Sequence, residues 1–150
     1  MQSEKLQFEA CKVLEWAKLL DLLAGYAQSE VGAEQCRSME LERDVAQARL
    51  RQEETSDMLR LRASVDPFPV LRFPDVTEWL RRVVKGACLE AHELRDIALV
   101  LELVVDVQRY LLRHQPDAPT VGAMAEQLGP VTEYRRLTVA LNGAIDPDGS

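Results

Sequence analysis

The sequence predicts an all-α protein of about seven helices, two of them long. Apolar residues recur at intervals of three and four along almost the whole chain, and the period-two alternation of a half-buried strand is missing. Glycines stand singly at the points where this pattern breaks. Of the 150 residues, 47% are hydrophobic and 29% are charged, a balance typical of one globular domain that can bury a sizeable core.

The first predicted helix is the most apolar of the set. It runs from about Cys11 to Ala27, and polar positions form only a narrow stripe along it. Such a helix is normally buried against several neighbours. Ser29 is then a candidate N-cap for a short second helix that continues to about Met39, with Glu30 near the positive end of the helix dipole.

The third predicted helix begins at the candidate N-cap Asp44 and continues to about Ala63. Its first half is mostly charged and its second half is apolar, which predicts a solvated beginning and an anchored end. Three prolines follow, and each removes a backbone donor and biases the preceding residue away from helix. We therefore expect an extended connection that is held to the core by Phe68, Leu71 and Phe73.

The second half of the chain predicts four more helices. Asp75 and Glu78 have the spacing of a capping box for the fourth helix, and Gly86 ends that helix. The fifth helix, from about Ala91 to His114, has one continuous apolar face and a length of about 35 Å at ~1.5 Å per residue. Two shorter helices follow on either side of a Gly-Pro stop and start signal, near Val121 to Leu128 and Val131 to Ala144.

Composition limits the function classes. The formal net charge of −7 argues against strong DNA binding by this chain alone, because autonomous nucleic-acid binders usually carry a basic patch. The N-terminus has no apolar signal-peptide core, and no window approaches ~18 uninterrupted apolar residues. Cys11, Cys36 and Cys88 form no CxxC pair, so neither a disulfide framework nor a zinc site is predicted. We expect a cytoplasmic protein with reduced thiols and no membrane partner.

Motifs that would supply chemistry are missing from the sequence. It contains neither a phosphate-binding GxxxxGK[ST] loop nor GxGxxG, and its two histidines stand in no nucleophile or metal-ligand pattern. Glu90, His92 and Glu93 are predicted to form a solvated first helical turn. Asp146 and Asp148 predict a tight turn and not a calcium loop. No catalytic, cofactor-binding or metal-binding residue is therefore predicted in this chain.

Basic residues supply the candidate binding positions. Two clusters each lie on adjacent turns of one predicted helix, where they could contact phosphate or simply form a solvated face. The candidate nucleic-acid contacts are Arg81, Arg82, Lys85, Arg135 and Arg136. A second group of the same kind flanks the proline-rich connection and consists of Arg60, Arg62 and Arg72.

The stretch LEWAKLLDLLAGYAQSEVG, residues 14–32, resembles the start of the bacterial MutS-two proteins. Members of that family typically begin with a leucine-glutamate-aromatic helix followed by Tyr-Ala-x-Ser-x-x-Gly. Three further matches follow in the order of the family, although Trp16 replaces the usual phenylalanine or tyrosine and Ala87 replaces a common glycine. They are Glu54-Thr55-x-Asp57, with Asp57 where glutamate is usual, the segment from Pro74 to Leu94, and Ile145 to Gly149.

The resemblance spans about residues 13–149 and implies the first half of a MutS-type helical core and lever domain. Residues 1–10 would be a poorly ordered N-terminal lead, and residues 11–150 a core segment of a longer protein. The family resemblance implies a homodimeric ATPase that uses ATP and Mg²⁺ and often carries an Smr endonuclease domain. Those groups lie outside this segment, so no catalytic residue is carried over. The mismatch-reading Phe-x-Glu motif is also missing, because Phe8 and Glu9 are adjacent.

Two functional hypotheses follow from these observations. The resemblance implies a non-catalytic scaffold of a protein that binds branched DNA and suppresses homologous recombination, or that rescues collided ribosomes. The alternative is a stand-alone helical module for protein–protein interaction. An autonomous enzyme would require a site that the residues do not supply. The apolar first helix is expected to keep some uncovered surface in an isolated chain, which favours dimerisation or helix-to-helix packing.

Overall fold

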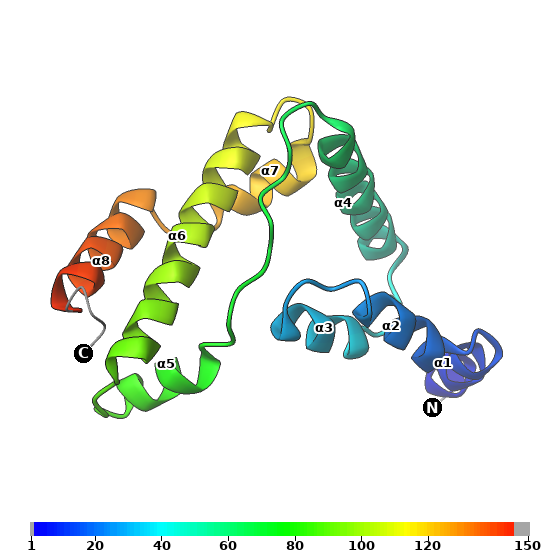
Figure 1. Cartoon of the computed structure of the whole chain (residues 1–150). Coiled ribbons are helices and arrows are strands. Elements are labelled where there is room, and N and C mark those ends of the chain that lie inside the picture. The colour runs from blue at the N-terminus through cyan, green and yellow to red at the C-terminus, as the bar shows by residue number, and fades with distance from the viewer. Residues whose placement is uncertain (1, 146–150) are drawn as a thin grey trace. The chain divides into compact units, whose positions relative to one another are not determined.

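The computed structural model describes the backbone of residues 2–145 and the side chains of residue 6 and residues 8–145. This part of the chain contains no strand, which confirms the all-α class. Its eight helices are α1 (Gln2–Val13), α2 (Trp16–Ala24), α3 (Glu30–Arg37), α4 (Val45–Ala63), α5 (Thr77–Val84), α6 (Ala91–Arg113), α7 (Pro119–Glu126) and α8 (Val131–Ala144) (Figure 1). The turn expected at Asp146 and Asp148 lies outside the described residues.

The chain divides into two compact units. The N-terminal unit comprises residues 1–48 and holds α1, α2, α3 and the beginning of α4. The C-terminal unit comprises residues 49–150 and holds the rest of α4 together with α5 to α8. Within the described residues, no helix combines the length and the apolar character that crossing a membrane requires.

The first predicted helix is broken into α1 and α2. Glu15 adopts φ 50° and ψ 42°, a left-handed conformation that is costly for a residue with a Cβ atom. The prediction of one helix from residue 11 to residue 27 was therefore wrong. The break was not predicted because no glycine or proline marks it in the sequence. Beyond it, α2 packs on α3 and buries Leu20 and Ala24. Helix α1 runs across residue 10, the expected end of the N-terminal lead.

Two helix starts in the N-terminal unit confirm the caps expected from the sequence. The Ser29 hydroxyl accepts a hydrogen bond from the Gly32 N–H at 3.1 Å, and Glu30 opens α3. The Asp44 carboxylate accepts from the Ala46 N–H at 2.9 Å at the start of α4. Both caps satisfy backbone donors that the first turn of a helix leaves without intrahelical partners.

The anchored end of α4 depends on a buried carboxylate. Asp57 is only 1% exposed, and its Oδ2 accepts hydrogen bonds from the N–H groups of Thr120 at 2.7 Å and Val121 at 3.1 Å. These donors form the first turn of α7, whose N-cap residue, Ala118, has no side-chain acceptor. Arg60 pairs with Asp57 Oδ1. Asp57 thus caps a helix that begins 62 residues later in the chain.

The core of the C-terminal unit forms around this cap. It consists of Leu61, Tyr110, Ala118 and Val121, with Met58, Phe68 and Leu111 packed against it. The connection between α4 and α5 is extended, as the prolines predicted, and follows α6 (Figure 1). Phe68 contacts Tyr110 edge to face with ring centroids 5.1 Å apart, so it holds the connection as expected. Leu71 is exposed and Phe73 is half-buried.

The start of α5 differs from its prediction. Asp75 Oδ1 accepts a hydrogen bond from the Thr77 N–H at 2.9 Å, but the N-cap residue is Val76 and no capping box forms. Glu78 instead lies 3.6 Å from Arg81. The end of α5 agrees with its prediction, because Gly86 adopts φ 83°, the left-handed conformation that glycine favours after a helix.

The last three helices agree with their predictions within two residues. Helix α6 packs on both α7 and α8, and α8 begins directly after Pro130. Gln108 from the buried side of α6 donates Nε2–H hydrogen bonds to the carbonyls of Ala125 at 3.0 Å and Gly129 at 3.2 Å. This amide therefore satisfies carbonyls at the C-terminal end of α7, opposite the end that Asp57 caps.

We predict that Asp57→Ala lowers the free energy of unfolding by about 2–4 kcal/mol, because it removes a cap and leaves buried donors without a partner. Asp57→Asn should cost less, since its amide oxygen can still accept one of the two N–H groups. Urea denaturation followed by circular dichroism measures both. Glu53→Ala on the exposed half of α4 is the matched control and should change stability by less than ~0.5 kcal/mol. An Asp57→Ala variant as stable as this control would contradict the capping role.

Candidate functional site

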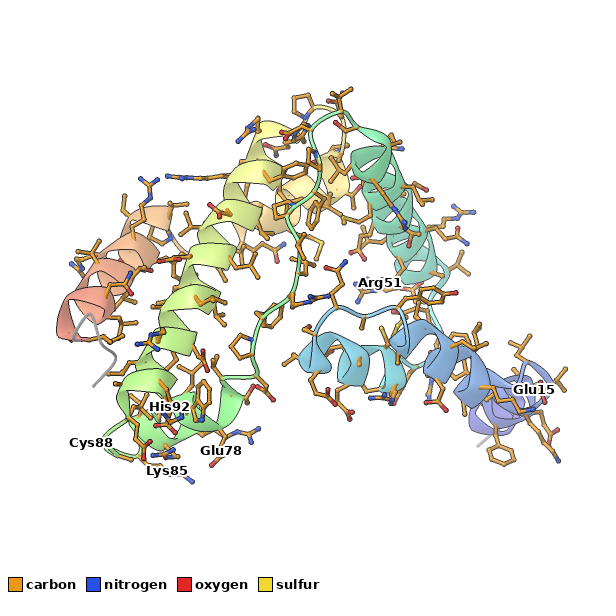
Figure 2. All side chains as sticks on the ribbon, in the orientation of Figure 1. Glu15, Arg51, Glu78, Lys85, Cys88 and His92 are labelled. Carbon is orange, nitrogen blue, oxygen red and sulfur yellow. The ribbon has the colours of Figure 1, made fainter. Side chains whose placement is uncertain are left out.

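The corner between α5 and α6 contains three of the five candidate cations. Figure 2 shows Glu78, Lys85, Cys88 and His92 gathered at this corner. Arg82 makes contacts within the protein and is not available to a ligand. Its Nη1 lies 2.5 Å from Glu93 Oε1, and its Nη2 donates to the Cys88 carbonyl at 3.3 Å. Arg82 therefore joins the end of α5 to the start of α6, a role that the sequence did not indicate.

Glu93 is the buried partner in this corner. Its residue is 5% exposed, and its Oε2 accepts a hydrogen bond from the Glu90 N–H at 2.9 Å, which completes a capping box at the start of α6. The hydrogen bond from the Glu90 backbone, followed by that from Arg82, lowers the pKa of Glu93 below its ordinary 4.5. The expected solvated first turn is thus correct for Glu90 and His92, whose side chains are mostly exposed, and wrong for Glu93.

Arg81 and Lys85 lie on the outer side of the same helix. Arg81 is 3.6 Å from Glu78, and since both side chains are about two-thirds exposed this pair contributes little stability. Lys85 is exposed at the C-cap. Between these cations, Leu80 and Val84 line a shallow hollow of about 420 Å³. Arg81 and Lys85 remain candidate nucleic-acid contacts. They lie beside an apolar strip and do not form a purely basic patch.

Arg135 and Arg136 occupy a different part of the C-terminal unit. Both are exposed on α8, and Arg135 lines an open hollow with Arg109, Glu102 and Asp106 of α6. The two carboxylates offset the positive potential there, which weakens the case for a phosphate site. This hollow lies along the middle of α6, whereas α5 adjoins its beginning (Figure 1). The structure does not bring the two candidate clusters into one surface.

A second polar cluster joins the end of α6 to the proline-rich connection. Arg113 Nη1 and His114 Nε2 each lie 3.0 Å from Asp66 Oδ2, and the Tyr110 hydroxyl donates to the Asp66 carbonyl at 2.8 Å. The contacts with His114 and Arg113 lower the pKa of Asp66, and burial raises the pKa of Tyr110. The sequence did not predict this cluster, because Asp66 is 44 to 48 positions away from its partners on α6.

These polar groups contact one another and hold neighbouring segments together. His114 is held between Asp66 and the Tyr110 ring, whose centroid is 4.4 Å away, and no contact joins it to a nucleophile in the described residues. Among the side chains that the structure describes, no group of three histidine, cysteine, aspartate or glutamate residues could hold a metal ion. The three cysteines are free. An open hollow of about 600 Å³ in the N-terminal unit is lined mainly by apolar atoms, with Trp16 and Leu20 among its walls.

Helix α2 presents a second apolar face besides the one that packs on α3. Leu19, Leu22 and Leu23 lie on one face of α2 and are exposed, and so is Tyr26 in the turn that follows the helix. We call these four residues the α2 stripe. Leu20 and Ala24 occupy the other, buried face. The structure thus explains why the opening helix is apolar nearly all round: one face is used within the N-terminal unit, and the other is uncovered.

Comparison with known proteins places this chain beside one group of bacterial proteins. It is 30% identical to Endonuclease MutS2 of Latilactobacillus sakei over 93% of its length, 27% identical to that of Symbiobacterium thermophilum over 92%, and 32% identical to that of Pelotomaculum thermopropionicum over 94%. The matched parts make up only 17–18% of these relatives, so the chain spans less than a fifth of their length. No family model and no solved structure matches.

We predict that Glu93 contributes to acid sensitivity. Because its pKa is lowered on folding, the stability it contributes is present above its ordinary value of 4.5 and is lost as the pH falls through the folded-state pKa. Glu93→Gln should therefore flatten the decline of unfolding free energy with acidification below that pH. Urea midpoints between about pH 3 and 6 measure this slope. Glu53→Gln, on the exposed half of α4, should keep the wild-type slope, and an equal slope for Glu93→Gln would contradict the prediction.

Proposed function

Because this chain corresponds to a segment of a MutS-two family protein, we propose that it is the non-catalytic, N-terminal helical scaffold of a longer DNA-binding ATPase and endonuclease. The observation that carries this proposal is the asymmetry of the matches. They cover 92–94% of the chain but only 17–18% of each relative. This coverage supports a segment of a longer protein, to which we assign a structural contribution.

The geometry supports a scaffold built on two long helices. Helices α4 and α6 have 19 and 23 residues, so at ~1.5 Å per residue they reach about 28 and 34 Å. Each is fixed by polar contacts at a defined point: α4 by Asp57, and α6 by Glu93 at its start and by Asp66 at its end. Long helices that are fixed at defined points can carry a displacement over that distance.

The activity of the whole protein is part of the same proposal. We assign it binding of branched DNA with suppression of homologous recombination, or rescue of collided ribosomes. ATP, Mg²⁺ and an Smr endonuclease domain would be held outside residues 1–150. The relatives are named endonucleases, which supports a nuclease elsewhere in the protein. The full-length chain would act as a homodimer in the cytoplasm and have no membrane partner.

The α2 stripe favours one alternative. Exposed apolar residues on a single helix face also suit a stand-alone helical module that binds another protein. Such a module would exist in the cell as a short chain, whereas the scaffold would exist only as part of a long one. The two functions therefore differ in the size of the cellular protein.

We predict that an antibody raised against this chain detects a cellular protein several times larger than 16.9 kDa on an immunoblot of its native source. The relatives are more than five times as long as the matched region, which gives the expected direction and rough size. The purified chain is the size control. A cellular product of 16.9 kDa would reject the scaffold and favour the stand-alone module.

We also predict that the isolated chain does not retard a four-way DNA junction at about 150 mM salt, whereas the full-length protein does. The net charge of −7 opposes the release of counterions from phosphate that drives such binding. A mobility-shift titration measures both. In the full-length protein, Arg81→Ala with Lys85→Ala tests the exposed cations of α5, and Arg135→Ala with Arg136→Ala is the matched pair on α8. Tight binding by the isolated chain would contradict the prediction that its negative net charge prevents binding without the rest of the protein.

A further inference from the structure

The side-chain amide of Gln108 has a buried oxygen without a partner. Gln108 is 5% exposed, and in the part of the chain that the structure describes, its Oε1 is buried and accepts no hydrogen bond. Buried polar groups in folded proteins nearly always pair with the protein or with ordered water, because an unsatisfied acceptor costs free energy. This oxygen therefore requires a hydrogen-bond donor.

Reversing the amide would not supply that donor. Gln108 Nε2 lies 3.0 Å from the carbonyl oxygen of Ala125 and 3.2 Å from that of Gly129. Carbonyl oxygens only accept hydrogen bonds, so a reversed amide would place Oε1 against acceptors and leave these carbonyls without their donor. The end of α7 thus fixes the orientation of the amide, with Nε2 and not Oε1 facing it.

Tyr134 of α8 contacts the same glycine as Gln108 and has an unused donor. The Tyr134 hydroxyl oxygen accepts a hydrogen bond from the Gly129 N–H at 3.0 Å, and among the described residues no group accepts the hydroxyl hydrogen. A Cβ atom at Gly129 would lie 3.0 Å from the hydroxyl oxygen, so glycine permits this close approach. Gln108 and Tyr134 therefore both contact Gly129, one with an unused acceptor and the other with an unused donor.

An open hollow borders this part of the contact between α6 and α8. The two helices pack on each other (Figure 1), and the hollow has a volume of about 430 Å³. Val105 and Thr138 are among its walls, and they stand one helical turn from Gln108 and Tyr134 respectively. Solvent therefore has a short route to the two groups.

The molecule that fits these two groups is small and neutral and both donates and accepts hydrogen bonds. Because Oε1 is buried, a side chain of another protein does not reach it. An ammonium ion could donate, but burying its charge beside an uncharged amide and a hydroxyl would be costly. Water has both functions, and a buried water typically makes about three hydrogen bonds to groups of this kind.

We propose that Gln108 Oε1 and the Tyr134 hydroxyl bind one buried water molecule where α6, α7 and α8 meet. The water donates one hydrogen to Oε1 and accepts the hydroxyl hydrogen of Tyr134. This site goes beyond the proposed function, because it does not depend on the length of the parent protein. It joins α8 to the amide that satisfies the carbonyls at the end of α7, so the three helices share one hydrogen-bond network.

A high-resolution crystal structure of the chain tests the proposal. We expect a water peak about 2.8 Å from both Gln108 Oε1 and the Tyr134 hydroxyl oxygen. Gln108→Met keeps an unbranched side chain of similar length but lacks the amide, so this peak should be lost. Gln127→Met, at an exposed glutamine on the C-cap of α7, is the matched control and should retain the peak.

Oxygen-17 magnetic relaxation dispersion provides an independent measurement in solution, because it counts buried waters that exchange slowly with the solvent. The count should fall by one water molecule in Gln108→Met and stay at the wild-type value in Gln127→Met. Tyr134→Phe removes the second partner of the water and should lower the count as well. This variant keeps the solution measurement decisive if Gln108→Met does not fold.

Three crystallographic results would overturn the proposal. They are a direct hydrogen bond from the Tyr134 hydroxyl to Gln108 Oε1, a reversed Gln108 amide, and an Oε1 atom without a water peak within hydrogen-bond distance in the wild-type chain. In solution, a count of buried waters that stays at the wild-type value in both Gln108→Met and Tyr134→Phe would overturn it too.

Discussion

The C-terminal unit depends on a hydrogen-bond acceptor that α7 does not carry in its own sequence. Ala118 stands at the N-cap, so the N–H groups of Thr120 and Val121 would be buried without partners, at a cost comparable to that of losing hydrogen bonds. Asp57 supplies both contacts from α4. Leu61, one turn further along α4, then packs with Val121 in the core. One carboxylate thereby sets how α4 and α7 meet, and the hydrophobic contacts follow from that arrangement.

The same principle operates at both ends of α6. Near its start, Glu93 of α6 pairs with Arg82 of α5. Near its end, Arg113 and His114 contact Asp66 of the proline-rich connection. Each tie joins α6 to a segment that could otherwise move independently: the short α5 in one case and the proline-rich connection in the other. Burying a carboxylate is costly unless it is paired and hydrogen-bonded, so the contacts of the buried Glu93 specify one geometry and penalise alternatives. Asp66 is about half exposed, so its contacts add less.

The sequence predicted those features whose causes are local. The caps at Ser29 and Asp44, the stop at Gly86 and the bounds of α6 and α8 all depend on residues within a few positions of one another. The roles of Asp57 and Arg82 were not predictable in this way, because their partners are set by tertiary packing. The break at Glu15 was missed for a related reason, since no residue of left-handed preference marks it. Long-range polar contacts leave no spacing signal in one sequence.

Polar contacts stabilise the C-terminal unit, whereas the exposed apolar side chains of the α2 stripe belong to the N-terminal unit. This difference affects how the segment can fold. The C-terminal unit is held by contacts among its own residues: Asp57 on α7, Gln108 on the end of α7, and the pairs of Glu93 and Asp66. None of these contacts requires the α2 stripe to be covered. Domains generally fold as units during synthesis, and exposed apolar surface is then a hazard until its neighbour arrives. Because its stabilising contacts are internal, the C-terminal unit can form its own packing whether or not the α2 stripe is covered.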